Sequence, residues 1–137
     1  MTLVYSPEYN NHQNEYHIEN KSRTDAIIEN LSNQIFFNKL KVFKPEYAHL
    51  NDILSVHTPE HVNFIDEFCQ SGGGNIDFDT YATPKTYQTA LLSAGGAICA
   101  SKLVLSGEKW AFSISRPPGH HATGNKSMGF CIFNNVA

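Results

Sequence analysis

The stretch Trp110-Ala111-Phe112-Ser113-Ile114 alternates large and small side chains and runs into Arg116-Pro117-Pro118-Gly119-His120-His121-Ala122. Alternation with a period of two predicts a β-strand over residues 110–114. Helical patterns precede this strand, and helices alternating with strands favour an α/β fold with a largely parallel sheet. Ligands of such sheets bind beyond the carboxyl ends of the strands. Residues 116–122 therefore stand where a functional site is expected.

The paired histidines of this stretch suggest acid–base chemistry. Two prolines and Gly119 predict a stiff turn that holds His120 and His121 on one side of the chain. Imidazole titrates near neutral pH, so a fixed pair can take a proton from water and return one to a leaving group. Amide hydrolysis needs both steps. The alternative is a surface turn histidine beside a hydrogen-bonded core histidine, and the residues that follow the pair favour the first interpretation.

Segments upstream of the strand supply the other predicted elements. The patterns predict a strand at 3–5 and helices over 23–38, over 48–54, from Thr58-Pro59 onward and over 83–106. Ser22 and Asp25 resemble a capping box, and Gly107 stands where the last helix needs a left-handed cap. The polar stretch 8–20 is longer than most loops of compact domains, which favours a position near a site.

Two stretches rich in glycine differ in what they predict. Ser93-Ala94-Gly95-Gly96-Ala97 has little side-chain bulk although it lies inside a predicted helix. Each glycine costs a helix roughly 1 kcal/mol relative to alanine, so we expect another part of the chain to pack closely there. Ser71-Gly72-Gly73-Gly74-Asn75 predicts a turn, and it lacks the Lys-Ser/Thr that a phosphate-binding loop requires.

Composition excludes several classes of protein. A length of 137 residues corresponds to one domain, and a hydrophobic content of 41% excludes global disorder. The net charge is −3 without a basic cluster, no long apolar run stands out, and the first residues lack the features of a signal peptide. We expect a soluble cytoplasmic protein with no nucleic acid or membrane partner. Three cysteines about thirty residues apart favour reduced thiols.

Arg116-Pro117-Pro118-Gly119-His120-His121-Ala122, together with Gly129-Phe130-Cys131-Ile132-Phe133-Asn134-Asn135-Val136-Ala137, closely resembles the histone deacetylase superfamily, which includes acetoin-utilisation-type proteins and acetylpolyamine amidohydrolases. The stretch 17–23 is similar to the family's His-Pro-Glu-x-Pro-x-Arg motif, with Ile18 and Lys21 in place of proline. The resemblance extends over most of the chain. It implies a three-layer, arginase/deacetylase-like α/β fold.

The resemblance also implies an activity and a set of site residues. Members hydrolyse acetyl-lysine or acetylated amines with one zinc ion at the bottom of a narrow channel. His120 and His121 would be the acid–base pair, Gly129 and Phe130 would line the channel, and Cys131 would lie beside the site. By the same resemblance, Asp79 or its neighbour Asp77 would hold the substrate at the rim, and Arg23 would line an internal cavity.

The zinc ligands of the family, an Asp-x-His pair and a further Asp, follow the Phe-Asn-Asn motif and do not occur in residues 1–137. We therefore expect these residues to form the N-terminal portion of a single, truncated deacetylase domain, inactive by itself. One alternative is a non-catalytic binding module or a degenerate remnant of the family. Another is a metal-relay protein using His57 and His61, but Thr58-Pro59 begins a helix between them.

Overall fold

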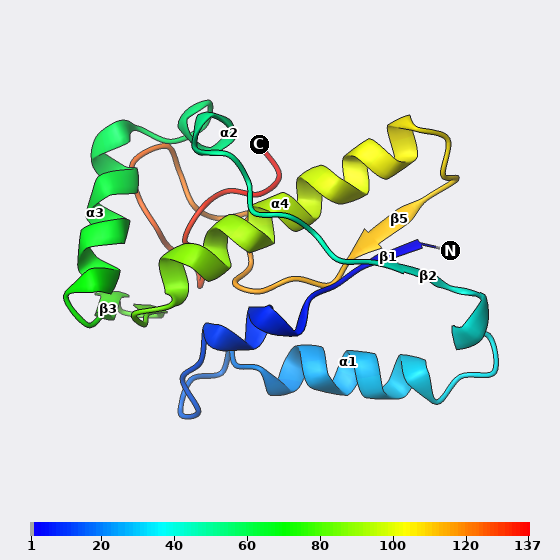
Figure 1. Ribbon diagram of the computed structural model, residues 1–137. Helices are drawn as coiled ribbons and strands as arrows, with labels where there is room; N and C mark the ends of the chain where they lie inside the picture. The colour runs from blue at the N-terminus through cyan, green and yellow to red at the C-terminus, as the bar shows by residue number, and fades with distance from the viewer. Residues whose placement is uncertain (1) are drawn as a thin grey trace.

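The computed structural model describes residues 2–137, which form a parallel sheet flanked by helices (Figure 1). Strands β1 (Thr2–Val4), β2 (Lys41–Phe43) and β5 (Ala111–Ser113) lie in the order β2-β1-β5. Both pairings are parallel, with Leu3 opposite Val42 on one side and Phe112 on the other. The parallel sheet and the strand after the last helix are confirmed. Strand β2 was not predicted, because its three residues are all exposed and carry no core pattern.

Helices lie on both sides of the sheet in Figure 1, where α4 (Thr86–Leu105) passes above the strands and α1 (Ser22–Ser32) below them. Helix α4 packs on β1 and β5, and α3 (Pro59–Gln70) packs on α4. The remaining helices are short: α2 (Leu50–Leu54) and the 3-10 helices η1 (Pro7–Asn11) and η2 (Phe37–Lys39). The predicted Thr58 cap is confirmed, since its hydroxyl accepts the backbone N–H of His61 at 3.3 Å.

Helix α1 is shorter than the predicted range of 23–38, because it ends at Ser32. The hydroxyl of Ser32 turns back to the carbonyl of Glu29, and Asn33 caps the end, so polar groups satisfy the final turn where the pattern predicted more helix. The predicted capping box is also wrong. The carboxamide oxygen of Asn20, rather than Ser22, accepts the first free N–H, at 2.9 Å from the nitrogen of Ser22.

The glycines of α4 allow the close packing that the sequence predicts. A β-carbon at Gly95 would overlap the carbonyl oxygen of Glu46, and one at Gly96 would lie 2.5 Å from the Tyr9 hydroxyl. The helix ends at Leu105, and Gly107 follows it in the predicted left-handed conformation, with a φ of +106° and its N–H donated to the Val104 carbonyl. Although no membrane span was predicted, α4 has the length and mean hydropathy (1.3) of one, with 44% of that window buried.

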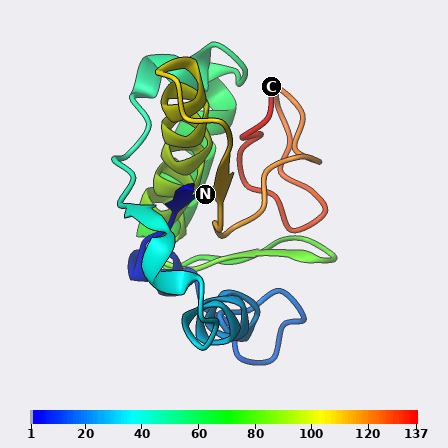
Figure 2. The same ribbon diagram turned by 90° about the vertical axis from the view of Figure 1, so that its right-hand side faces the viewer.

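A β-hairpin that the sequence patterns did not reveal follows α3. Strands β3 (Gly74–Asp77) and β4 (Thr80–Ala82) pair antiparallel, with an irregularity between Asn75 and Asp77. The predicted glycine turn is present, but it leads directly into this hairpin, and Gly73 packs against the backbone of Ala82. Figure 2 shows the hairpin reaching toward the same side of the molecule as the loops near the C-terminus.

The segment after the histidines forms turns and contains no strand. Gly129 and Phe130 both have positive φ values, 57° and 69°, which bend the chain, and only an isolated bridge joins Met128 to Cys131. The following Ile132 and Phe133 are buried in the core beneath α3 and α4. Asn134 does act like a helix cap, since its side-chain oxygen accepts the N–H groups of residues 136 and 137.

Candidate functional site

One pocket of about 790 Å³ lies beyond the carboxyl end of β5. Its walls come from the loop before α1, the end of the β3–β4 hairpin and the turns of residues 115–136. Of the seven predicted site residues it brings together six, namely Arg23, Asp79, His120, His121, Gly129 and Phe130. The seventh, Cys131, lies directly behind them. The predicted proximity of the polar stretch 8–20 to a site is also seen, since Ile18 and Glu19 line the pocket.

The imidazoles of His120 and His121 lie side by side at the pocket wall. Their ring centroids are 4.3 Å apart with an angle of 51° between the planes, and both residues are exposed. Gly129 packs flat against His121, because a β-carbon there would come within 2.9 Å of the ring. Within residues 2–137, neither ring hydrogen-bonds to a side chain. Their placement therefore depends on the backbone that carries them.

The buried thiol of Cys131 holds that backbone from behind. The N–H groups of His120 and His121 both point at Cys131 Sγ, each at 3.4 Å. The thiol in turn lies 3.3 Å from the carbonyl oxygen of Gly129 and can donate to it. Because this one side chain contacts both histidine amides and Gly129, it holds the histidine turn against the backbone of Gly129.

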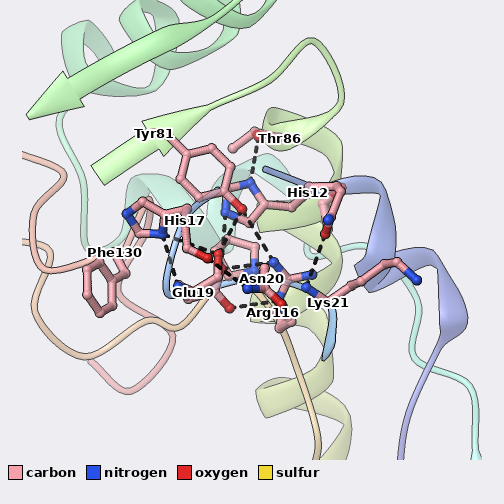
Figure 3. A network of polar contacts seen from close by, with 12 residues as sticks. His12, His17, Glu19, Asn20, Lys21, Tyr81, Thr86, Arg116 and Phe130 are labelled. Atoms are coloured by element: carbon pink, nitrogen blue, oxygen red, sulfur yellow. Dashed lines mark hydrogen bonds and ion pairs between the residues drawn. The ribbon is translucent and has the colours of Figure 1, made fainter. Parts of the chain in front are cut away.

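A buried ion pair joins the loop before α1 to the turn that carries the histidines (Figure 3). Arg116, which is completely buried, donates from Nε and Nη2 to the two carboxylate oxygens of Glu19 at 2.6 and 2.9 Å. Its Nη1 donates to the carbonyl of Tyr9 at 3.3 Å. Burial acts to raise the pKa of Glu19, but hydrogen bonds from His12 and Arg116 and the charge of Arg116 lower it to about 2.

His12 and Tyr81 complete this buried network. Their rings stack at 4.3 Å with an angle of 5°. His12 Nε2 lies 3.5 Å from Glu19, which can only accept, while Nδ1 lies 2.7 Å from the Thr86 hydroxyl. We assign the proton to Nε2 on this basis. Burial lowers the pKa of His12 against the opposing effect of Glu19, and burial followed by the Glu19 charge raises the pKa of Tyr81 to about 12.

The rim of the pocket is built by His17, Phe130 and the end of the hairpin. The ring of Phe130 meets His17 edge-on at 5.2 Å, and its N–H donates to the Thr80 hydroxyl at 3.0 Å. The second contact holds Phe130 in its left-handed conformation, with a φ of 69°. His17 Nε2 lies 3.0 Å from the carbonyl of Asp79, so the imidazole links the loop before α1 to the β3–β4 hairpin.

The structure separates the two acidic residues proposed for the rim. Asp79 lines the pocket, and its carboxylate accepts the Thr80 hydroxyl at 2.9 Å. Asp77 instead pairs with Lys126 at 3.1 Å. Arg23 also lines the pocket; its Nη2 donates to the Ser115 carbonyl at 2.8 Å, and its Nε atom lies 4.0 Å from Glu19.

Within residues 2–137, no group of three or more His, Cys, Asp or Glu side chains is arranged to hold a metal ion. His57 and His61 lie with their rings 5.2 Å apart, but both are buried in the core. His57 Nε2 accepts the N–H of Asn134 at 2.8 Å, and His61 Nε2 lies 3.4 Å from the carbonyl of Ile132. These contacts give the two residues a structural role.

The sequence analysis predicted no role for Arg116, Glu19, His12 or Tyr81, although the structure places all four in one buried network. An arginine is almost never fully buried unless it is paired, so the completely buried Arg116 requires an acidic partner nearby. The partner stands 97 residues earlier in the chain, and no local pattern marks it.

Comparisons with known proteins agree on one family. A family model described as the histone deacetylase domain matches residues 17–137. A probable deacetylase of Methanothermobacter thermautotrophicus is 44% identical over 137 residues, which is all of this chain and 40% of that protein. A histone deacetylase-like amidohydrolase of Pseudomonas aeruginosa is 44% identical over 87 residues, which is 63% of this chain and 23% of that protein.

The fold agrees with a solved structure of the same family. The crystal structure of the HDA15 HD domain superposes with a TM-score of 0.90 and 29% sequence identity, covering 99% of this chain and 42% of that one. The chain spans about two fifths of the length of the first two archaeal relatives, both described as probable deacetylases.

Proposed function

Because the chain belongs to the histone deacetylase family, we propose that it is the N-terminal portion of a single deacetylase domain that hydrolyses the amide bond of acetyl-lysine or of a small acetylated amine. The observation that carries the proposal is the exposed pair His120 and His121 at the wall of a pocket. We expect the protein to act in the cytoplasm, with neither nucleic acid nor membrane as a direct partner.

The two imidazoles would divide the proton transfers of the reaction. One neutral ring accepts a proton from the attacking water, and a protonated ring gives a proton to the departing amine, because an amine leaves readily only once it is protonated. With ring centroids 4.3 Å apart, both rings can reach groups on the same substrate carbon. The stiff turn of Pro117, Pro118 and Gly119 would hold the two adjacent rings in place for these proton transfers.

The walls of the pocket suit an extended acylated amine. Phe130 and Gly129 present an apolar face for the aliphatic stem, and Asp79 offers an acceptor at the rim for a substrate N–H. Arg23 at the far end provides a positive charge that would favour the acetate product. Cys131, buried behind the histidines, would act on their backbone and not on the substrate.

Zinc belongs to the proposal at the level of the family only. The side chains of residues 2–137 do not form a set that fits the ion, since no cluster of three donors occurs among them. We propose that the ligands lie farther along the complete domain, where zinc would polarise the acyl carbonyl. The proposed proton transfers involve only His120 and His121 of this chain.

The test measures acetate release by the complete protein from an acetyl-lysine peptide and from acetylputrescine, with and without zinc. We expect His120→Ala and His121→Ala each to lower kcat by about 10²-fold or more, the scale of general acid–base catalysis. His49→Asn changes an exposed histidine outside the pocket and serves as the matched control. Full activity in both alanine variants would overturn the proposal, and residues 1–137 alone should release no acetate.

A further inference from the structure

We propose that Ser93 and Asn135 are positioning residues that together clamp the turn in front of the histidine pair. The inference rests on the proposed function for its catalytic meaning, but its geometry is independent of it. Ser93 lies in α4, in the stretch of small residues, and is completely buried. Asn135 lies in the segment after the core residues Ile132 and Phe133 and lines the pocket.

Three hydrogen bonds define the clamp. The Ser93 hydroxyl donates to the carbonyl of Pro117 at 2.7 Å. Asn135 donates twice. Its side-chain Nδ2 donates to the Ser93 oxygen at 2.9 Å, and the backbone N–H of Asn135 donates to the carbonyl of Gly119 at 2.7 Å. Ser93 and Asn135, bonded to each other, thus hold the carbonyl groups of Pro117 and Gly119, which lie shortly before His120.

Close packing reinforces these bonds. A β-carbon added at Gly119 would overlap the side chain of Asn135, so the carboxamide lies directly against the backbone of the turn. On the other side, Gly95 and Gly96 let α4 approach the Glu46 backbone and the Tyr9 hydroxyl, which fixes where Ser93 stands. The turn is therefore held between a firmly packed helix and one amide side chain.

The clamp matters for the histidine pair because, within residues 2–137, the rings are held by packing against each other and against Gly129 and by no hydrogen bond. Neither imidazole hydrogen-bonds to a side chain, so the direction of each ring follows from the backbone at 117–121. Cys131 also holds the amides of His120 and His121, at 3.4 Å, but a thiol sulfur is a weak acceptor. The clamp supplies shorter bonds directly before these residues, and a small displacement of catalytic groups costs much of the rate.

Amide hydrogen exchange tests the clamp without relying on activity. We expect Ser93→Ala and Asn135→Ala each to raise exchange at least tenfold at the amides of His120, His121 and residue 135, while the amide of Ile114 in the sheet is unchanged. Thr89→Val is the matched control, because it removes a buried hydroxyl of the same helix that bonds only to the Lys85 carbonyl. If Ser93→Ala fails to fold, Asn135→Ala decides, since Asn135 stands outside the helices.

Activity of the complete protein supplies the second measurement. We expect both clamp variants to lower kcat at least tenfold with KM changed less than twofold, and Thr89→Val to leave both constants unchanged. Unaltered exchange at His120 and His121 in Asn135→Ala, or unaltered kcat in both variants of an active enzyme, would overturn the inference. An inactive wild-type protein whose exchange still responds would contradict the proposed function while supporting the clamp.

Discussion

The carboxylate of Glu19 and the guanidinium of Arg116, 97 positions apart in the chain, form two hydrogen bonds of 2.6 and 2.9 Å inside the protein. This pair connects the loop before α1 to the turn that carries His120 and His121. Removal of one member leaves the other charge buried without compensation. The pair therefore governs both the stability of the fold and the shape of the pocket.

Substitution of Glu19 by glutamine should destabilise the protein strongly. The amide keeps the shape of the side chain but leaves the buried charge of Arg116 without a counter-ion, which typically costs about 3–5 kcal/mol. Denaturation by urea, followed by circular dichroism, measures the change in the free energy of unfolding. Glu29→Gln, on the exposed face of α1, is the control and should alter stability by no more than about 0.5 kcal/mol. Equal effects of the two substitutions would contradict the role given to the pair.

Stability should fall in acid over a range that the pKa of Glu19 defines. Although burial opposes ionisation, His12 and Arg116 lower this pKa from its ordinary value of 4.5 to about 2. The unfolded chain then binds a proton at a higher pH than the folded protein does. The contribution of Glu19 is complete above pH 4.5 and disappears as the pH falls toward 2. Urea titrations across this range should show a steeper loss for the wild type than for Glu19→Gln, and parallel curves would refute the assignment.

Substitution of Gly129 by alanine should disturb the histidine pair more than the same substitution at a comparable glycine elsewhere. The new methyl group would meet the ring of His121 at 2.9 Å, and the φ of +57° adds roughly 1–2 kcal/mol of backbone strain. Gly72→Ala is the control, since its φ is also positive but nothing lies within 4 Å. We expect the NMR signals of the His121 ring to shift in Gly129→Ala only. Unshifted signals would show that the ring does not rest on Gly129.

The three cysteines should react with a thiol reagent in an order set by burial. Cys69 and Cys131 are 1% and 0% exposed, whereas Cys99 is only partly buried. In the folded protein, iodoacetamide should therefore modify Cys99 first, and peptide mass spectrometry can follow each site. After unfolding in urea all three should react at similar rates. Early modification of Cys131 in native protein would mean that the support behind the histidines opens readily.

Local patterns predicted the elements whose signals are contained within a few residues. The alternation of residues 110–114, the Thr58-Pro59 start of α3 and the glycine that ends α4 each act through neighbouring atoms, and each is found in the structure. Strand β2 was missed because its three exposed residues pair with β1, which lies far away in the sequence. The β3–β4 hairpin pairs neighbouring segments, but its strands are short, irregular in register and without alternating burial, so no period of two marks them.

In the candidate site, too, motif residues could be predicted from the sequence and the partners that hold them could not. The motifs that carry the family resemblance named six residues that share one pocket, along with Cys131 behind it. The partners that hold them, such as His12 against Tyr81 or Ser93 against Pro117, meet only when the chain is folded. A stacking contact or a helix hydroxyl leaves no periodicity in a sequence, so these contacts required coordinates.

The position of β1 between its two neighbours has a consequence for synthesis on the ribosome. The strand is translated before both β2 and β5, and nearly seventy residues separate those two partners. Because the ribosome adds about 5–20 residues per second, the edge of β1 that pairs with β5 stays unpaired for roughly 3–14 s after β2 has been made. During that interval the nascent chain has an open strand edge, and Glu19 has not yet met Arg116, so the last part of the described chain completes both the sheet and the buried ion pair.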